Sequence, residues 1–214
     1  MILTIIYGIY KRKDFAMKTT TKLCTIAVCS LVFLCSCNAP NNGTSENYAA
    51  ATTEITDIAN TENEYVGYTF EYPKSWNVIR NDGMICVQSN EDNPDNRVTI
   101  SCTTFDSNDP MLTVLAYWDG DGTEENPGYY NRMKKTLGGS FTEISRKETK
   151  LGNTGAPALK VTYEAEVADR TYRFSQVISV MQGSVYTFTY TALPETFEVW
   201  ESALTHAVTS FSMK

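Results

Sequence analysis

The stretch "RTYRFSQVISVMQGSVYTFTYTA", residues 170–192, decides the fold of this protein. On both sides of Gln182-Gly183, aromatic and branched residues alternate with polar ones, and a glycine at that point suits a tight turn. One face of residues 170–181 carries Tyr172, Phe174, Ile178 and Val180, and one face of residues 184–192 carries Tyr186, Phe188 and Tyr190. The pattern predicts two antiparallel strands joined as a hairpin.

Further strands are expected on the N-terminal side of this hairpin. Residues 158–167 alternate clearly between apolar and polar side chains, and residues 141–151 alternate weakly. Shorter alternating runs, which also predict strands, cover residues 67–73, 77–80, 84–89 and 97–105. Pro73 is expected to end the first of these runs because it has no N–H group to donate.

Three helices are predicted in the rest of the chain. Asp109 and Pro110 favour the start of the first, whose apolar residues are Met111, Val114, Leu115 and Trp118. Pro127 favours the start of the second, with Tyr130, Met133 and Leu137 on one face and Gly138-Gly139 at its end. Pro194 and Glu195 favour the start of the third, an amphipathic C-terminal helix with Phe197, Trp200, Leu204, Ala207, Val208 and Phe211 in one apolar stripe. The order of elements predicts an α+β domain over residues 65–214, with a largely antiparallel sheet covered by helices.

The N-terminal part has the pattern of a secretory signal. Lys18 and Lys22 precede an apolar stretch, residues 23–36, that is shorter than the ~20 residues of a membrane span. The sequence Leu34-Cys35-Ser36-Cys37 resembles the lipobox of bacterial lipoproteins. This resemblance implies that residues 17–36 are a signal peptide and that Cys37 receives a diacylglycerol and acyl chains such as palmitate. The alternative is an ordinary signal peptide that happens to contain cysteines.

Two segments flank this signal. Residues 1–16 precede an otherwise complete signal, so we expect translation to start at Met17, the alternative being a genuine N-terminal extension from Met1. Residues 38–64 are rich in Asn, Thr, Ala, Glu and Ser and poor in apolar residues. With the lipid-anchored Cys37 they are expected to form a flexible tether, whose 27 residues span roughly 30 Å.

Composition and charge exclude some classes of protein. A content of 42% hydrophobic and 12% aromatic residues is enough for a core, which excludes wholesale disorder. Residues 1–36 hold five of the 18 basic residues and one of the 25 acidic residues, so residues 37–214 hold 13 and 24, a net charge of −11. Such a surface repels phosphate backbones, so no nucleic-acid partner is expected. It also repels anionic headgroups, so membrane binding must come from the lipid.

Both ends of the domain resemble a known family. The segment "GYTFEYPKSW", residues 67–76, is similar to the opening strand and turn of PsbP-like domains. The segment "VYTFTYTA", residues 185–192, and the helix ending in "AVTSF", residues 207–211, are similar to the close of these domains. The resemblance implies an α/β/α sandwich, and the family includes an extrinsic photosystem subunit and bacterial lipoproteins of unknown role. The matching residues are structural and include no metal ligands, so the resemblance assigns no catalytic residue, cofactor or metal.

Residues for chemistry are sparse. The single histidine, His206, lies off the apolar stripe of the last predicted helix, which is typical of a solvated side chain. Without a second histidine, a Ser or Cys nucleophile lacks its usual base, and no phosphate-binding, dinucleotide or zinc-protease motif is present. A pair of carboxylates remains as an alternative catalytic device. We therefore predict a protein that is not an enzyme.

The loop "WDGDGTEEN", residues 118–126, is the strongest candidate for binding. Asp119, Asp121, Glu124 and Glu125 are weak candidates for a Ca²⁺ site, because their spacing does not match an EF-hand, and a solvated loop is the alternative. Aromatic residues bracket this loop and are candidates for a binding surface or for the buried sides of two helices: Tyr117, Trp118, Tyr129 and Tyr130.

Cys86 and Cys102 lie on two neighbouring predicted strands. If Ser89 is opposite Thr99, Cys86 is opposite Cys102, and an extracytoplasmic compartment permits a disulfide. Two buried free thiols are the alternative.

These observations together predict a lipoprotein on the outer, extracytoplasmic face of the cell membrane. We expect a non-enzymatic binding or accessory module whose ligand or protein partner the sequence does not identify. The alternatives are a structural subunit of a membrane complex and a carboxylate-based envelope hydrolase.

Overall fold

The computed structural model describes residues 55–64, 66–81 and 83–214. In chain order its elements are β1 (Ile58–Asn63), β2 (Tyr68–Pro73), β3 (Asn77–Asn81), β4 (Met84–Gln88), β5 (Thr99–Asp106), α3 (Val114–Asp119), α4 (Gly128–Leu137), β6 (Thr142–Leu151), β7 (Ala156–Val167), β8 (Arg170–Met181), β9 (Ser184–Ala192), α5 (Phe197–Ser210) and β10 (Ser212–Met213). The predicted signal peptide, Cys37 and residues 38–54 of the predicted tether lie outside the described residues.

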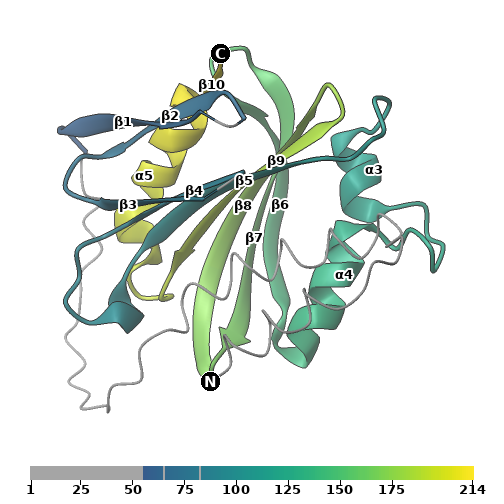
Figure 1. The fold of residues 1–214 in the computed structure, drawn as a ribbon. Helices are drawn as coiled ribbons and strands as arrows, with labels where there is room; N and C mark the ends of the chain where they lie inside the picture. Colours follow the sequence, from purple (N-terminus) through teal and green to yellow (C-terminus); the bar gives the residue numbers. More distant parts are fainter. Residues whose placement is uncertain (1–54, 65, 82) are drawn as a thin grey trace, which may run out of the picture.

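The hairpin of residues 170–192 lies inside a seven-stranded sheet (Figure 1). Its strand order is β3-β4-β5-β9-β8-β7-β6, and every neighbouring pair is antiparallel. Met181 pairs with Ser184 across the turn at Gln182-Gly183, as the alternating pattern predicts. β5 pairs with β9, so the first three strands of this sheet in chain order, β3 to β5, join the last four, β6 to β9, in the middle of the sheet.

A second sheet of three strands has the order β1-β2-β10. β1 is antiparallel to β2, and Thr61 and Asn63 of β1 are buried. The prediction of a tether over residues 38–64 is therefore wrong at its C-terminal end, because residues 58–63 form a strand. β1 contains few apolar residues and is held by backbone hydrogen bonds to β2. Backbone pairing of this kind produces no hydrophobic pattern in the sequence, so the strand was not predicted.

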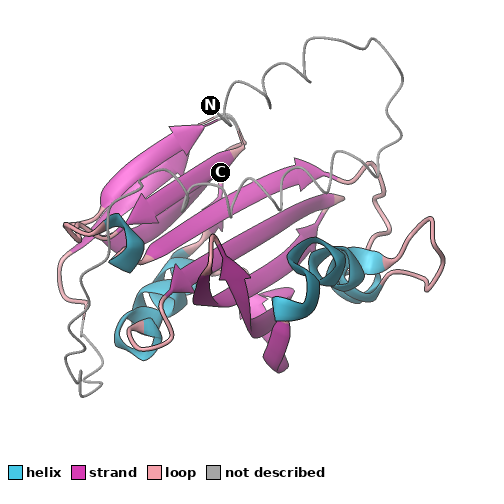
Figure 2. Ribbon diagram, turned by 90° about the horizontal axis from the view of Figure 1, so that it is seen from below, coloured by secondary structure: helices cyan, strands magenta, loops and turns pink. Residues whose placement is uncertain are grey.

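The large sheet has a separate hydrophobic cluster on each face, because successive side chains of a strand point in opposite directions. On one face, α5 and the three-stranded sheet pack over Phe188 and Tyr190 of β9. On the other face, α3 and α4 pack over Tyr163 of β7 and Phe174 of β8. Figure 2 shows α5 and the α3–α4 pair over different parts of the strands. The α+β class with a large antiparallel sheet is confirmed, whereas three helices cover the sheet only in part.

The start of α3 differs from the prediction. The cap is Thr113, whose Oγ1 accepts a hydrogen bond from the Ala116 amide at 3.1 Å. Asp109 instead accepts from the Met111 amide at 2.9 Å in a turn before the helix, and Met111 is 83% exposed. The expected helix start at Asp109 and the expected apolar role of Met111 were wrong, because Thr113 provides a competing cap four residues later.

The C-terminal end of α5 is capped by the turn between β6 and β7. The Gly152 amide donates to the Val208 carbonyl at 2.9 Å, and the Asn153 amide donates to the Phe211 carbonyl at 3.2 Å. The last carbonyls of a helix have no partner within the helix, so this turn satisfies two backbone groups beyond the reach of α5 itself. The amphipathic helix predicted from the apolar stripe is thus bound to the sheet at its C-terminal end, and its own Leu204 and Ala207 are buried.

Candidate functional site

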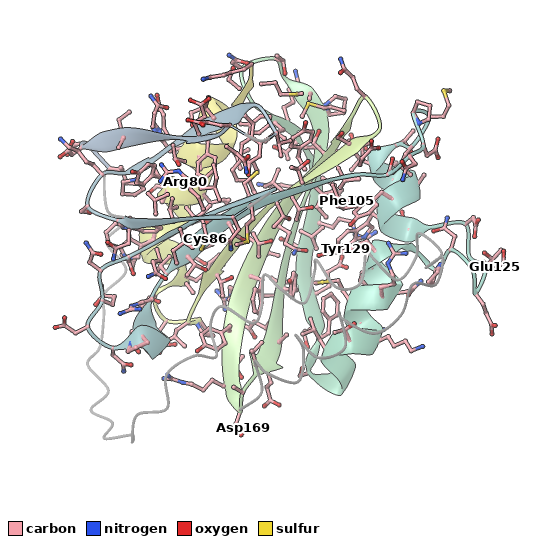
Figure 3. The ribbon with its side chains drawn as sticks, in the orientation of Figure 1. Arg80, Cys86, Phe105, Glu125, Tyr129 and Asp169 are labelled. Carbon is pink, nitrogen blue, oxygen red and sulfur yellow. The ribbon has the colours of Figure 1, made fainter. Side chains whose placement is uncertain are left out.

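Of the four acidic side chains at the loop between α3 and α4, two make contacts within the protein and two are exposed to solvent. Asp119 Oδ1 lies 3.2 Å from Arg146 Nη1 on β6. Asp121 Oδ1 accepts from the Thr123 amide at 3.0 Å and from Thr123 Oγ1 at 2.6 Å, and these hydrogen bonds lower the pKa of Asp121. Glu124 and Glu125 are exposed, and Figure 3 shows Glu125 at the outer tip of the loop. Within the described part of the chain, no three His, Cys, Asp or Glu side chains converge as metal ligands.

The aromatic residues beside this loop belong mainly to the core. Tyr117, Trp118 and Tyr129 are at most 5% exposed, and only Tyr130 is half-buried. Tyr117, Trp118 and Tyr129 therefore do not form the expected binding surface. They lie on the buried sides of α3 and α4, which was the alternative interpretation. The guanidinium carbon of Arg146 lies 5.2 Å from the ring centres of both Trp118 and Tyr130. This cation–π contact fastens β6 to the helix pair.

The two cysteines of the domain are free and buried. Cys86 pairs with Ser101 and Cys102 pairs with Ile85, so the two thiols point to opposite faces of the sheet. The register differs by one residue from the one that would bring the cysteines together, since Gln88 rather than Ser89 is opposite Thr99. A one-residue shift moves a side chain to the other face, so the disulfide alternative was wrong and two buried thiols remain.

Burial makes both thiols poor nucleophiles. Desolvation raises the pKa of Cys86 to about 12 and also raises the pKa of Cys102. At pH 8 the native domain is therefore expected to resist alkylation at both positions, and unfolding without reductant is expected to expose two reactive thiols. Peptide mapping after iodoacetamide treatment in native buffer and in urea measures this directly. A disulfide-linked pair of peptides that appears only without reductant would contradict the register described above.

His206 connects α5 to the smaller sheet. Its Nε2 atom lies 2.6 Å from Glu71 Oε2 on β2, without the alignment of a hydrogen bond. Ser210, one turn further along α5, accepts at Oγ from the Glu71 amide at 2.9 Å. Lys160 on β7 lies 2.6 Å from Glu201 on the same helix. Through these polar contacts α5 is linked to both sheets. His206, which the sequence predicted to be solvated, lies beside Glu71 of β2.

A group of small hydroxyl side chains was missed by the sequence analysis. They lie on the α4 side of β5 and β9, where the ladder sets Ser101 opposite Thr189 and Thr103 opposite Thr187. We call this group the hydroxyl face, and its members are Ser101, Thr103, Thr187, Thr189 and Thr191, all buried. The segment "TFTYT", residues 187–191, contains the signal, because threonines alternate there with the aromatic residues of the opposite face.

Gln176 of β8 borders the hydroxyl face opposite Thr189. Its Nε2 donates to the Tyr129 hydroxyl at 3.1 Å and to Thr189 Oγ1 at 3.2 Å. Its Oε1 has no hydrogen-bond partner, although the residue is only 3% exposed. Figure 3 shows Tyr129 reaching from α4 toward the sheet, and Cys86 further along the sheet on β4. The hydroxyl face and Gln176 thus form a group of polar side chains, none of which is charged.

Comparison with known proteins gives the family. The PsbP family model matches residues 56–213. The chain belongs to the PsbP family. The match includes β1, the strand that the sequence analysis had assigned to the tether. It also confirms the resemblance seen at both ends of the domain.

Two solved structures are similar to this chain at low sequence identity. LpqN, described as involved in cell envelope biogenesis of Mycobacterium tuberculosis, has 14% identity and a TM-score of 0.53, over 74% of this chain and 92% of that chain. CyanoP, the cyanobacterial PsbP from Synechocystis sp. PCC 6803, has 15% identity and a TM-score of 0.49, over 78% of this chain and 98% of that chain. No curated protein matches the chain significantly.

The helices of this PsbP-family domain are short. Among the residues that the structure describes, none forms a helix with the length and apolar character needed to cross a membrane.

Proposed function

We propose that this PsbP-family protein is a lipoprotein on the extracytoplasmic face of the cell membrane. Residues 17–36 are its signal peptide, and Cys37 carries the lipid. The support is the lipobox Leu34-Cys35-Ser36-Cys37, which lies shortly before the start of the family match at residue 56. After the correction at β1, residues 38–57 are the tether, and a coil of that length spans about 25 Å.

The domain acts as a binding or accessory module and not as an enzyme. The observation that carries this proposal is the family match over the whole described domain. The groups most suited to catalysis also have structural neighbours: His206 approaches Glu71, and Asp119 is paired with Arg146. LpqN has the same fold, and its description as involved in cell envelope biogenesis fits a role at the envelope here.

Replacement of the lipidated cysteine tests the anchor. In Cys37→Ala, incorporation of labelled palmitate is expected to fall to background, because no other thiol stands at the cleavage position. A precursor that keeps the signal peptide is expected to accumulate. The measurement is metabolic labelling followed by gel electrophoresis of the membrane and soluble fractions.

The matched control is Cys35→Ala, which changes a cysteine two residues away at the tolerant −2 position of the lipobox. It is expected to keep full labelling and the mature size. Equal labelling of Cys37→Ala and the unchanged protein would contradict lipidation at Cys37.

Crosslinking in cells tests the accessory role. The membrane-anchored protein is expected to give a recurrent crosslinked partner, protein or glycan, that persists when residues 38–57 are shortened. The crosslink to this partner should be weakened or lost when the domain is destabilised by a substitution in the turn that caps α5, such as Gly152→Ala. Catalytic turnover of an envelope substrate by the purified protein, lost on replacing one carboxylate, would instead favour a hydrolase.

A further inference from the structure

The turn before α3 and the first part of that helix expose apolar side chains to solvent. Met111 is 83% exposed and Leu115 is 52% exposed, and Pro110 and Ala116 are exposed as well. We call these four residues the apolar ridge. The other exposed large hydrophobic residues in the described part of the chain lie singly on three different strands: Ile58, Ile144 and Met213. Single exposed apolar residues are ordinary on a protein surface, whereas four within seven residues indicate a contact surface.

The fold holds the apolar ridge in a defined conformation. Leu112, in the middle of the segment, packs against the hydrophobic cluster beneath α3 and α4. The Met111 amide donates to Asp109 Oδ1 at 2.9 Å, which closes the turn, and the Ser107 amide donates to the Gly183 carbonyl at 2.9 Å, which fastens the segment to the β8–β9 hairpin. A preformed surface loses little conformational entropy when it binds. The ridge is therefore ready to receive a partner without refolding.

The chain around the apolar ridge is acidic. Residues 106–126 contain six acidic residues and no basic one: Asp106, Asp109, Asp119, Asp121, Glu124 and Glu125. Asp119 is paired with Arg146, and the other five form no ion pair with a described residue. This charge repels the anionic headgroups of a membrane. It also disfavours a symmetric contact with a second copy of the chain, because such a contact brings the same acidic segment against itself.

The surface that complements this ridge is apolar with basic borders. Leu115 offers a branched apolar side chain, and the thioether of Met111 is flexible and polarisable, so it adapts to the shape of a partner. Lys and Arg side chains cover apolar surface with their stems and carry the positive charge that the acidic segment attracts. A basic amphipathic helix combines both properties, because its apolar side chains recur at helical spacing and its charged side chains flank them.

We propose that the apolar ridge is the docking surface for a basic amphipathic helix of a protein partner. Met111 and Leu115 contact the apolar stripe of that helix, and the acidic residues of segment 106–126 attract its Lys and Arg side chains. The inference deepens the proposed accessory role by giving the chemistry of the partner. It rests on that role for the compartment, so the partner helix belongs to a protein at the extracytoplasmic face of the membrane.

The test uses the protein extracted from membranes in nonionic detergent and isotope-labelled at its methionine methyl groups. The probe is a synthetic amphipathic helix of about four turns built from Leu and Lys. Nuclear magnetic resonance is expected to show a saturable shift of the Met111 methyl signal at micromolar peptide, with the Met213 signal unchanged. Met111→Ser assigns the reporter signal. Raising NaCl from about 50 mM to about 500 mM is expected to weaken binding about tenfold, because salt screens exposed charges.

Leu115→Ser keeps the Met111 reporter and removes half of the proposed contact, so it is expected to weaken binding about fivefold or more. The matched control is Ile58→Ser, which changes an apolar side chain that is 39% exposed on β1, in the small sheet that Figure 1 shows away from α3. It is expected to leave the affinity unchanged, and the thermal midpoints of both variants show whether the fold is kept.

Four results would each overturn the proposal. The first is no saturable shift of the Met111 signal, and the second is an equal shift with a peptide in which Glu replaces Lys. The third is contact of the Met111 methyl group with detergent chains before peptide is added, which would identify a lipid surface as the occupant. The fourth is a shift that depends on protein concentration alone, which would identify a second copy. Palmitate labelling at Cys37 is measured separately, so failure here and failure of the lipoprotein proposal are distinguishable.

Discussion

Gly152→Ala is expected to destabilise the domain more than most single substitutions. Gly152 has φ +70°, where an L side chain costs about 1–2 kcal/mol. A Cβ atom built there would lie 2.4 Å from the Phe211 carbonyl oxygen, and the backbone shift that relieves this contact adds about 1–3 kcal/mol. The shift also breaks the two hydrogen bonds that cap α5. We expect a large loss in the free energy of unfolding and a loosened C-terminal helix.

Urea denaturation followed by tryptophan fluorescence measures this effect, because Trp200 on α5 contacts Trp76 with ring centres 5.6 Å apart. The matched control is Gly155→Ala in the same turn. Gly155 has φ +66°, but the nearest atom to its added Cβ is Lys150 Cδ at 3.5 Å. Its cost should be that of the left-handed backbone alone, about 1–2 kcal/mol. Equal losses for the two variants would contradict the proposed cap of α5 by this turn.

Gly128→Ala is expected to have a comparable effect at the other end of the fold. Gly128 has φ +78°, and an added Cβ would lie 2.3 Å from the carbonyl carbon of Asp119. The loop that joins α3 to α4 therefore closes with two backbone segments in direct contact. An alanine there costs about 1–2 kcal/mol for the left-handed backbone. Separating α3 from α4 adds a further ~1–3 kcal/mol, and the Arg146 stack on Trp118 and Tyr130 is expected to loosen.

Gly122→Ala is the control, since Gly122 lies in the same loop with φ +81° and has open space around its Cβ position. We expect Gly122→Ala to lose only the backbone contribution, and Gly128→Ala to show in addition a changed near-ultraviolet circular dichroism from the aromatic cluster. If Gly122→Ala were as damaging as Gly128→Ala, the close contact at the loop would not be the cause.

The parts of the fold with strong periodicity could be predicted from the sequence. The hairpin of residues 170–192 and the stripe of α5 combine a clear period with a large apolar area, so local pattern and tertiary packing agree. β1 could not be predicted in this way, because "IANTEN" has the composition of a loop and gains its stability from the ladder with β2. Backbone pairing across the chain leaves no trace in local composition.

The cysteines show how far register can be inferred. The two strands were placed correctly, but one residue of register decided whether the thiols meet or point apart. Register here depends on the ladder of β5 with β9 and on the clusters on both faces, which the two short strands alone do not encode.

The residues of the candidate site also differ in how far the sequence could identify them. The aromatic residues around the α3–α4 loop were predicted to form a binding surface because large side chains suit binding. Trp118 and Tyr129 are instead packed in the hydrophobic core. Thr187 and Thr189 were overlooked because threonine at alternate positions is ordinary in a strand. Only the pairing of β5, β9 and β8 brings these hydroxyls beside Gln176, so the site depends on topology rather than on a motif.

The mass of the mature protein tests the account most directly. Intact mass spectrometry of protein extracted from membranes is predicted to show a chain that begins at Cys37, with the added mass of a diacylglycerol and its acyl chains, and two free thiols at Cys86 and Cys102. A chain that keeps residues 17–36, or one cleaved elsewhere with an unmodified Cys37, would contradict the proposal that this PsbP-family domain is held at the membrane by lipid.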